Sequence, residues 1–344
     1  MRNGHFSTSI YEIISPFIIV LLLVPGRVTA ETPVRSDKTL KIAHNIWYYN
    51  FADAIDETNT LIQEEPFNPV GYFILGTIYQ SISESYRTDR FKDSIALYLD
   101  SAITLADGRK TVDPDNGDWY FITGASYGYR ALLRAFHGNW FGAFRDGLSC
   151  TSDLNRSLKL DSTLYDAYLG LGAYHYYRTI KAKDFLWLPF ISDQRDQGIA
   201  EIKIAAEHGF LASYNAEESL IRIYFTEERY AEAIALADSL TPGNPHDPYR
   251  LLYEAQALIA VGRLDDADEC IRQLRLAWKS SPYFDPFGLY EAEFQSARIF
   301  SKRGDKETAK KIIDRIIADR KMGRSNAYYL ETLDKAESFA PSVR

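Results

Sequence analysis

The residue types that most often carry catalysis or metal binding are scattered along this sequence without a functional spacing. The histidines are His5, His44, His137, His175, His208 and His246. No two of them stand four residues apart, as a helical zinc site of the His-Glu-x-x-His kind requires. We expect neither a nucleophile elbow nor a phosphate-cradling loop. The sequence therefore predicts no catalytic residue, no cofactor, no metal and no enzymatic activity.

One acidic segment has the composition of a calcium loop but not its spacing. In the segment that begins at Asp113, glycine comes fifth instead of sixth, and Gly124 stands where a calcium loop needs its bidentate glutamate. We interpret the segment as a turn into a helix, with Asp118 close to the N-cap position. His175 stands where similar segments have tyrosine, and we expect it to be a packed core imidazole.

Aromatic residues and arginine offer another kind of chemistry, the recognition of polypeptide, because they bury a large area and Tyr and Arg also donate hydrogen bonds. At helical spacing the candidates for such a surface are Phe73, Thr77, Phe121, Tyr129, Tyr176, Tyr177, Arg178, Arg222, Gln256 and Arg298. The alternative is that many of the tyrosines only pack helices together. A shift of one position in the helical register turns a groove residue into a core residue.

These candidates lie in segments that repeat one another. Residues 72–79, 120–127 and 168–175 share a tyrosine, a glycine four positions later and a tyrosine or histidine three positions after that. The spacing places the large residues on one helical face and the glycine where a neighbouring helix must come close. Other segments show the pattern of the second helix of the repeat, in which an alanine stands twelve residues before a proline, as from Ala233 to Pro245.

This pattern resembles the tetratricopeptide repeat, in which two antiparallel helices recur about every 34 residues. The run from Trp119 to Gly198 is similar to exported bacterial proteins of that family. The resemblance implies an all-α fold, a right-handed α-solenoid of about seven helical hairpins closed by a C-terminal capping helix. The expected hairpins are 37–66, 68–106, 116–161, 163–209, 212–245, 247–281 and 285–321. We expect the last helix near 325–339, with Ser325 or Asn326 as its N-cap and a polar face suited to closing the solenoid end.

Three hairpins exceed the ideal period, and their surplus lies at 81–90, 130–140 and 178–197. Insertions in a solenoid fall in loops on one face, so we expect these segments to be loops. The insertion 178–197 holds the apolar tract 185–190, in which Phe185, Trp187 and Phe190 are candidate partner-binding residues. Buried, the tract would plug the outside of the fourth and fifth hairpins. Exposed, it would contact a partner or be the one place of membrane contact.

The N-terminus has the layout of a secretory signal peptide. Arg2 precedes an apolar run from Ile13 to Val24, and small residues precede an expected cleavage site after Ala30. The run is shorter than the roughly 20 residues of a membrane span, although retention as an anchor stays an alternative. We expect residues 1–30 to be a signal peptide. Residues 31–344 would then be a single repeat domain exported to the periplasm or cell envelope of a bacterium.

The net charge of the chain bears on the kind of partner it can bind. Removing the first 30 residues takes away two arginines and one glutamate, which changes the formal charge from -8 to -9. Without a basic cluster we expect no nucleic-acid partner, since such binding needs a concentrated cationic surface.

Cys150 and Cys270 fall in hairpins three units apart, beyond the Cα separation of about 7 Å that a disulfide allows. We predict two buried free thiols.

The sequence thus predicts a non-enzymatic scaffold that binds a protein or peptide in the concave groove lined by its first helices. Two alternatives stay open. A helical-repeat subunit of a periplasmic small-molecule uptake system would need an enclosed cavity, and a structural envelope scaffold would use the convex face and the ends. An enzyme would require two or more convergent ionisable groups with displaced pKa values. Neither the identity of the partner nor the oligomeric state follows from the sequence.

Overall fold

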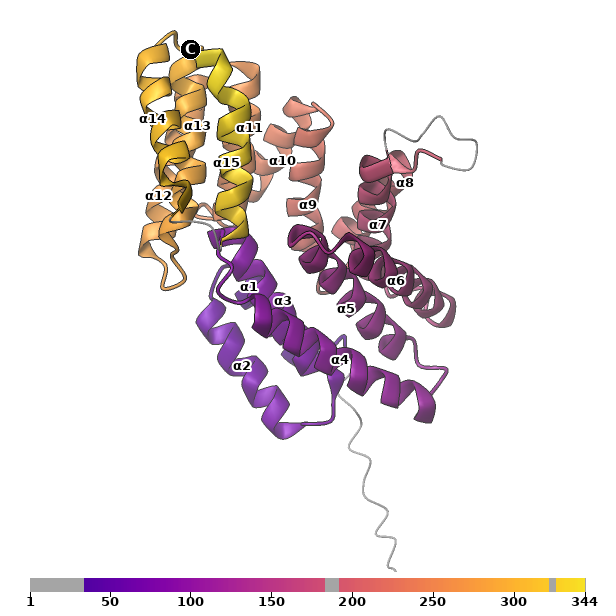
Figure 1. Ribbon diagram of the computed structural model, residues 1–344. Helices are drawn as coiled ribbons and strands as arrows, with labels where there is room; N and C mark the ends of the chain where they lie inside the picture. The colour runs from indigo at the N-terminus through magenta and orange to yellow at the C-terminus, as the bar shows by residue number, and fades with distance from the viewer. Residues whose placement is uncertain (1–33, 183–191, 322–325, 344) are drawn as a thin grey trace, which may run out of the picture. The chain divides into compact units, whose positions relative to one another are not determined.

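The computed structural model describes residues 34–182, 192–321 and 326–343, and within them the chain is all-α. No strand occurs in these three ranges. Fifteen α-helices follow one another, and each packs mainly against its neighbours in sequence, which is the arrangement of a helical-repeat solenoid (Figure 1). The expected fold class is confirmed. Within the same ranges, no helix combines the length and the apolar character needed to cross a lipid bilayer.

The helices form seven consecutive pairs and one final helix. The first four pairs are α1 (Asp37–Trp47) with α2 (Phe51–Glu64), α3 (Pro69–Tyr86) with α4 (Lys92–Val112), α5 (Gly117–Phe136) with α6 (Trp140–Leu160), and α7 (Ala167–Ala182) with α8 (Arg195–His208). The last three pairs are α9 (Ser213–Thr226) with α10 (Tyr230–Leu240), α11 (Pro248–Val261) with α12 (Leu264–Ser280), and α13 (Leu289–Lys302) with α14 (Lys306–Ala318). The final helix is α15 (Ala327–Phe339), capped by Asn326, whose side chain accepts a hydrogen bond from the Tyr329 backbone N–H at 3.0 Å. These pairs match the expected hairpins, and the N-cap is one of the two expected residues.

The repeated glycines lie where the two helices of a pair touch. A Cβ atom on Gly76 would stand 2.8 Å from Leu99 Cδ2, and Gly124 is equally close to α6. At Gly172 the obstacle is backbone, because the carbonyl oxygen of Gly198 would lie 2.5 Å from the added carbon. Backbone cannot rotate aside as a side chain can, so this position requires glycine. The repeat pattern therefore marked a true packing constraint.

The surplus residues of the second and third pairs are mostly helical, which corrects the expectation that they form loops. Helix α3 continues to Tyr86 and α5 continues to Phe136, so much of the segments 81–90 and 130–140 adds helical turns. Neither extension contains Gly or Pro before its helix ends, so nothing in the local sequence breaks the helix. Longer hairpins, and not loops on one face, take up the extra length.

In the fourth pair both ends of the surplus 178–197 are helical. Helix α7 ends at Ala182, and α8 begins at Arg195. The apolar tract 185–190, with its candidates Phe185, Trp187 and Phe190, lies outside the described residues. Its role as a plug or as a contact surface stays a prediction.

The core is a continuous cluster of buried apolar side chains that runs from Val34 to Ile299. A second, smaller cluster lies among α13, α14 and α15. Cys150 and Cys270 belong to the large cluster, and both are buried free thiols. Burial raises the pKa of each thiol to about 12, so both are unreactive in the folded chain.

Contacts between early and late helices join segments that are far apart in sequence. The Trp278 indole N–H donates to the Ser85 carbonyl oxygen at 2.7 Å across 193 residues. The Thr88 hydroxyl donates to Asp285 Oδ2 at 2.7 Å across 197 residues. The end of α3 is therefore attached to the last pairs as well as to its neighbours in sequence.

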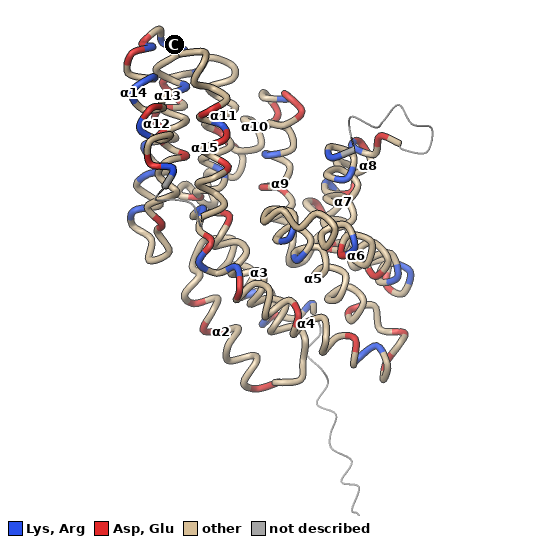
Figure 2. The backbone as a smooth tube through the Cα atoms, in the orientation of Figure 1, with Lys and Arg blue, Asp and Glu red and all other residues tan. Residues whose placement is uncertain are grey.

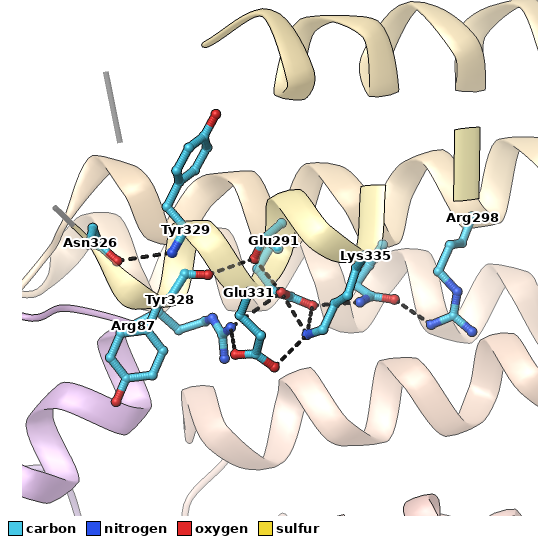
Figure 3. Close-up of polar contacts among 10 residues, drawn as sticks. Arg87, Glu291, Arg298, Asn326, Tyr328, Tyr329, Glu331 and Lys335 are labelled. Atoms are coloured by element: carbon cyan, nitrogen blue, oxygen red, sulfur yellow. Dashed lines mark hydrogen bonds and ion pairs between the residues drawn. The ribbon is translucent and has the colours of Figure 1, made fainter. Parts of the chain in front are cut away.

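A buried ion network strengthens this junction (Figure 3). Glu291 of α13 is 0% exposed and accepts hydrogen bonds from Thr332 Oγ1 at 2.7 Å and from Lys335 Nζ at 3.2 Å. Arg87 directly follows α3. Its Nη2 atom lies 3.5 Å from Glu291 Oε2 and donates to Glu331 Oε2 at 2.7 Å. Burial by itself would raise the pKa of Glu291, but the charges of Lys335 and Arg87 outweigh it and lower this pKa to about 2.

The polar face of α15 is thus turned partly inward, where we expected it only to close the solenoid end. The network differs from the other charges on the last pairs, where Lys and Arg are interspersed with Asp and Glu along α12, α13 and α14 (Figure 2). Arg263 and Asp266, for example, form an ion pair with both side chains 54% exposed. Exposed pairs of that kind contribute little, whereas breaking a buried network is costly.

Candidate functional site

A cavity of about 600 Å³ lies between the first helices of the first five pairs. Its walls come mainly from α1, α3, α5, α7 and α9, and the start of α6 adds one side. Phe73 packs against Phe121 with ring centroids 5.8 Å apart and against Tyr129 at 6.3 Å. Small residues such as Gly170 and Ala173 leave room beside these rings. The volume falls in the range of about 300–1,000 Å³ that is typical of ligand sites.

The structure brings seven of the ten groove candidates together around this cavity. Those seven are Phe73, Thr77, Phe121, Tyr129, Tyr177, Arg178 and Arg222. They come from α3, α5, α7 and α9, so helices in four successive pairs contribute to one surface. That these residues contact a partner stays a prediction.

The other three candidates lie elsewhere. Tyr176 is 0% exposed, and its hydroxyl donates to Glu227 Oε1 at 2.9 Å. Gln256 is buried within α11, and Arg298 donates to Gln295 Oε1 at 2.7 Å beside the ion network (Figure 3). Successive residues on a helix point about 100° apart, so Tyr176 and Tyr177 face different sides of α7. Tyr177 therefore lines the cavity, and Tyr176, one position earlier, does not.

Several residues at the open side of the cavity were missed by sequence reasoning. Trp140 and Phe144 on α6 are 53% and 57% exposed and still line the cavity. Lys181 of α7 lies over the Trp140 ring at 4.4 Å from its centroid. The spacing of four between the two aromatic residues was the available signal, because it places them on one helical face. The groove candidates were expected on first helices, whereas Trp140 and Phe144 begin a second helix.

Polar groups gather at the other side of the cavity, around Arg222. Its guanidinium lies 5.2 Å from the centroid of the Tyr177 ring and 6.0 Å from that of Tyr249. Burial opposes the charge of Arg222, but the surrounding tyrosines and Glu84 raise its pKa well above the ordinary value. Gln80 donates from Nε2 to Glu84 Oε1 at 2.6 Å. The aromatic rings of Tyr177 and Tyr249 thus flank the Arg222 cation. The charged residues that line the cavity are Arg178, Lys181, Arg222, Glu84, Asp166 and Glu218.

A second polar cluster adjoins this side and ties three elements together. Tyr49 lies in the turn after α1, and its hydroxyl oxygen is 2.9 Å from Glu218 Oε1 and 2.6 Å from Asp247 Oδ1. Tyr214 donates to Asp247 Oδ2 at 2.7 Å, and the Arg250 backbone N–H donates to Asp247 Oδ1 at 2.9 Å. Burial, followed by the charge of Asp247, raises the pKa of Glu218 well above its ordinary value. The Tyr49 and Tyr214 hydroxyls and the Arg250 backbone N–H thus supply hydrogen-bond donors to the carboxylates of Glu218 and Asp247.

The sequence motifs for chemistry do not acquire the structural setting they need. Residues 124–128 do read Gly-x-Ser-x-Gly, contrary to our expectation of no such elbow, but Ser126 is 0% exposed within α5. A nucleophile elbow needs a strand-to-helix turn that exposes the serine. The N-cap of α5 is Asn116, and Asp118 is the second residue of the helix, in its first turn. His175 is half-buried and pairs with Glu201 Oε2 at 2.6 Å. Among the described residues, no group of three or more His, Cys, Asp or Glu side chains could hold a metal ion.

Comparisons with known proteins give likenesses of fold only. No protein-family model matches the chain, and no curated protein matches its sequence. Similar solved structures include a tetratricopeptide repeat protein from Parabacteroides merdae ATCC 43184, 14% identical over 88% of this chain and 99% of that one, with a TM-score of 0.41. They also include human IFIT1, solved as a dimer with PPP-AAAA, 14% identical over 88% of this chain and 72% of that one, with a TM-score of 0.43. The fold assignment rests on this chain's own helix pairs.

Proposed function

We propose that the chain is a non-enzymatic scaffold that binds a segment of a protein or peptide in the cavity between its first helices. The observation that carries this proposal is the cavity of about 600 Å³, with aromatic walls contributed by successive helix pairs. Repeat solenoids present such surfaces to extended partners. Phe73, Phe121 and Tyr129 would receive apolar side chains, and Arg222 would supply a polar anchor.

The proposed binding is tested by peptide selection with a variant that fills the cavity. A displayed library of random twelve-residue peptides is selected against the protein, and the affinity of selected peptides is measured for Ala173→Trp and Ala52→Trp. Ala173 lines the cavity on α7, whereas Ala52 is exposed on α2. We expect Ala173→Trp to weaken binding at least about tenfold and Ala52→Trp to leave it unchanged, with both variants keeping the far-UV circular dichroism of the parent.

Two outcomes would contradict the proposal. Peptides that bind Ala173→Trp as tightly as the parent would show that the cavity is not their site. A library that yields no binder, while apolar small molecules raise the melting temperature of the parent but not of Ala173→Trp, would favour a small-molecule uptake subunit. The volume of the cavity and its mostly apolar lining are the observations that keep this second candidate.

We also propose that the chain is exported to the bacterial periplasm or cell envelope, with residues 1–30 removed. This rests on the order of a basic residue, an apolar run and small residues before Ala30. N-terminal sequencing of the protein recovered from a periplasmic fraction should begin at Glu31. Recovery in the cytosolic fraction with Met1 intact would contradict export.

A further inference from the structure

Three buried polar atoms in the cavity lining lack a hydrogen bond of good geometry to any described residue. They are Gln80 Oε1 on α3, Tyr177 Oη on α7 and Arg222 Nε on α9. Buried polar atoms are nearly always paired, because leaving one unpaired costs free energy. Three such atoms from three helices on one cavity therefore indicate a hydrogen-bonding ligand.

The roles of these atoms are fixed by their neighbours. Gln80 uses its Nε2 to donate to Glu84 Oε1 at 2.6 Å, so its remaining Oε1 is an acceptor. Arg222 Nε is a donor at any accessible pH. Burial raises the pKa of Tyr177 although the charge and the hydrogen-bonding side chain of Arg222 oppose this, so the phenol keeps its proton and can donate. These three atoms thus offer one acceptor and two donors.

The same groups are linked through Glu84. The charge of Glu84 acts on both Arg222 and Tyr177, and the Arg222 guanidinium lies 5.2 Å from the Tyr177 ring centroid. An anionic ligand would meet Glu84, and a cationic ligand would meet Arg222. A cation such as an amine would also lack an acceptor for the two donors. An uncharged group is therefore favoured at this place.

We propose that this part of the cavity binds an uncharged secondary amide with apolar substituents, the main-chain amide of an apolar peptide segment. The amide carbonyl oxygen has two lone pairs and accepts from Tyr177 and Arg222, while its N–H donates to Gln80 Oε1. The acceptor comes from α3 and the donors from α7 and α9, and a secondary amide carries its donor and its acceptor on separate atoms. A hydroxyl has both on one oxygen and fits less well.

The walls next to the polar groups suit the apolar part of such a ligand. Phe73, Phe121 and Tyr129 form a packed aromatic set on the same cavity, and Ala173 and Gly170 leave space beside it. The carboxylate at the end of a peptide would meet the charge of Glu84, so this part of the cavity excludes it and binds an internal amide. This inference rests on the proposed function, and it adds that the anchored part of the peptide is internal and uncharged.

The test uses small probes whose one polar group is varied. N-benzylacetamide carries one secondary amide and one ring. Benzyl acetate lacks the N–H, benzyl alcohol replaces the amide by a hydroxyl, and phenylacetate is anionic. Binding of each probe to the full protein is measured by ligand-observed NMR titration. We expect the amide to bind about tenfold more tightly than the ester and the alcohol, the effect of a hydrogen bond lost in a buried site, and phenylacetate not to bind.

Variants assign the effect to the three atoms. Gln80→Met should weaken the amide to the affinity of the ester and leave the ester unchanged, because only the amide N–H uses Gln80. Tyr177→Phe should weaken the amide and the ester alike, since both present a carbonyl oxygen. Tyr174→Phe is the matched control, because Tyr174 also lines the cavity on α7 but its hydroxyl is not among the unpaired buried atoms. That variant should bind all probes as the parent does.

Equal affinities for amide, ester and alcohol on the parent would overturn the inference even if every variant failed to fold. Binding of phenylacetate at or above the affinity of the amide would overturn it as well, in favour of an anion site at Arg222. These results are separable from those for the proposed function. Selected peptides that require an open cavity, together with probes that show no amide preference, leave the scaffold standing and remove the amide site. The reverse combination keeps the amide site and removes the polypeptide as its source.

Discussion

Replacing Glu291 with glutamine should destabilise the protein in a way that depends on pH. Glu291 is 0% exposed and is held by Lys335 and Arg87, which lower its pKa to about 2 from an ordinary value of 4.5. At about 1.4 kcal/mol for each pH unit, this gap corresponds to roughly 3 kcal/mol of stability. Because the pKa is lower in the folded chain, the contribution is complete above pH 4.5 and is lost as the pH falls towards 2.

Urea denaturation followed by circular dichroism measures this effect. At pH 7 we expect Glu291→Gln to lower the free energy of unfolding by roughly 3 kcal/mol, because Arg87 and Lys335 lose a buried anionic partner while Glu331 remains. Near pH 2.5 the parent's Glu291 is largely protonated on unfolding, so the difference should shrink to below about 1 kcal/mol. The control is Glu307→Gln on α14, whose side chain is 80% exposed and pairs only with the exposed Lys311 among the described residues. That variant should show no measurable change.

The reasoning would be refuted by a gap between the parent and Glu291→Gln that is the same at both pH values. Such a result would mean that glutamine fails for reasons of packing and not of charge. No gap at pH 7 would refute the reasoning as well, because it would show that the network in Figure 3 contributes nothing net.

Further predictions concern packing, capping and the thiols. Gly172→Ala should destabilise the protein by about 1–3 kcal/mol, because the added carbon meets backbone at 2.5 Å. Gly108→Ala on α4, with nothing within 4 Å, should instead stabilise it by about 0.5–1 kcal/mol; thermal unfolding compares the two, and equal effects would contradict the packing model. Asn326→Ala removes the N-cap of α15 and should cost about 1 kcal/mol in urea denaturation, with an unchanged midpoint counting against the cap. In the folded chain, neither Cys150 nor Cys270 should react with a thiol reagent at pH 8. After denaturation without a reducing agent two thiols should react, and finding no reactive thiol would mean that the two cysteines form a disulfide.

The candidate site shows how far helical register can be read from sequence. The tyrosine and arginine positions on first helices led to Tyr177 and Arg222, which do line the cavity. They also led to Tyr176, which is buried against Glu227. A repeat as degenerate as this one fixes the helical face to within one residue, and one residue is about 100° of rotation. The unpaired Oε1 atom of Gln80 could not be identified from the sequence, because it is left over when Nε2 donates to Glu84 and no local pattern marks it.

The sequence by itself determined the order of the helices, their pairing and several of their ends. These features depend on residues close in sequence: the apolar spacing of each helix, the N-cap of α15 at Ser325 or Asn326, and Gly76 and Gly172 where paired helices touch. The tertiary structure alone decided which distant pairs meet, as Ser85 with Trp278 and Arg87 with Glu331 do across 193 and 244 residues. No local spacing encodes such contacts, because they result from small rotations accumulated from pair to pair. For the same reason only the folded chain could show a cavity between the first helices and a glutamate whose pKa is set by cations from two other segments.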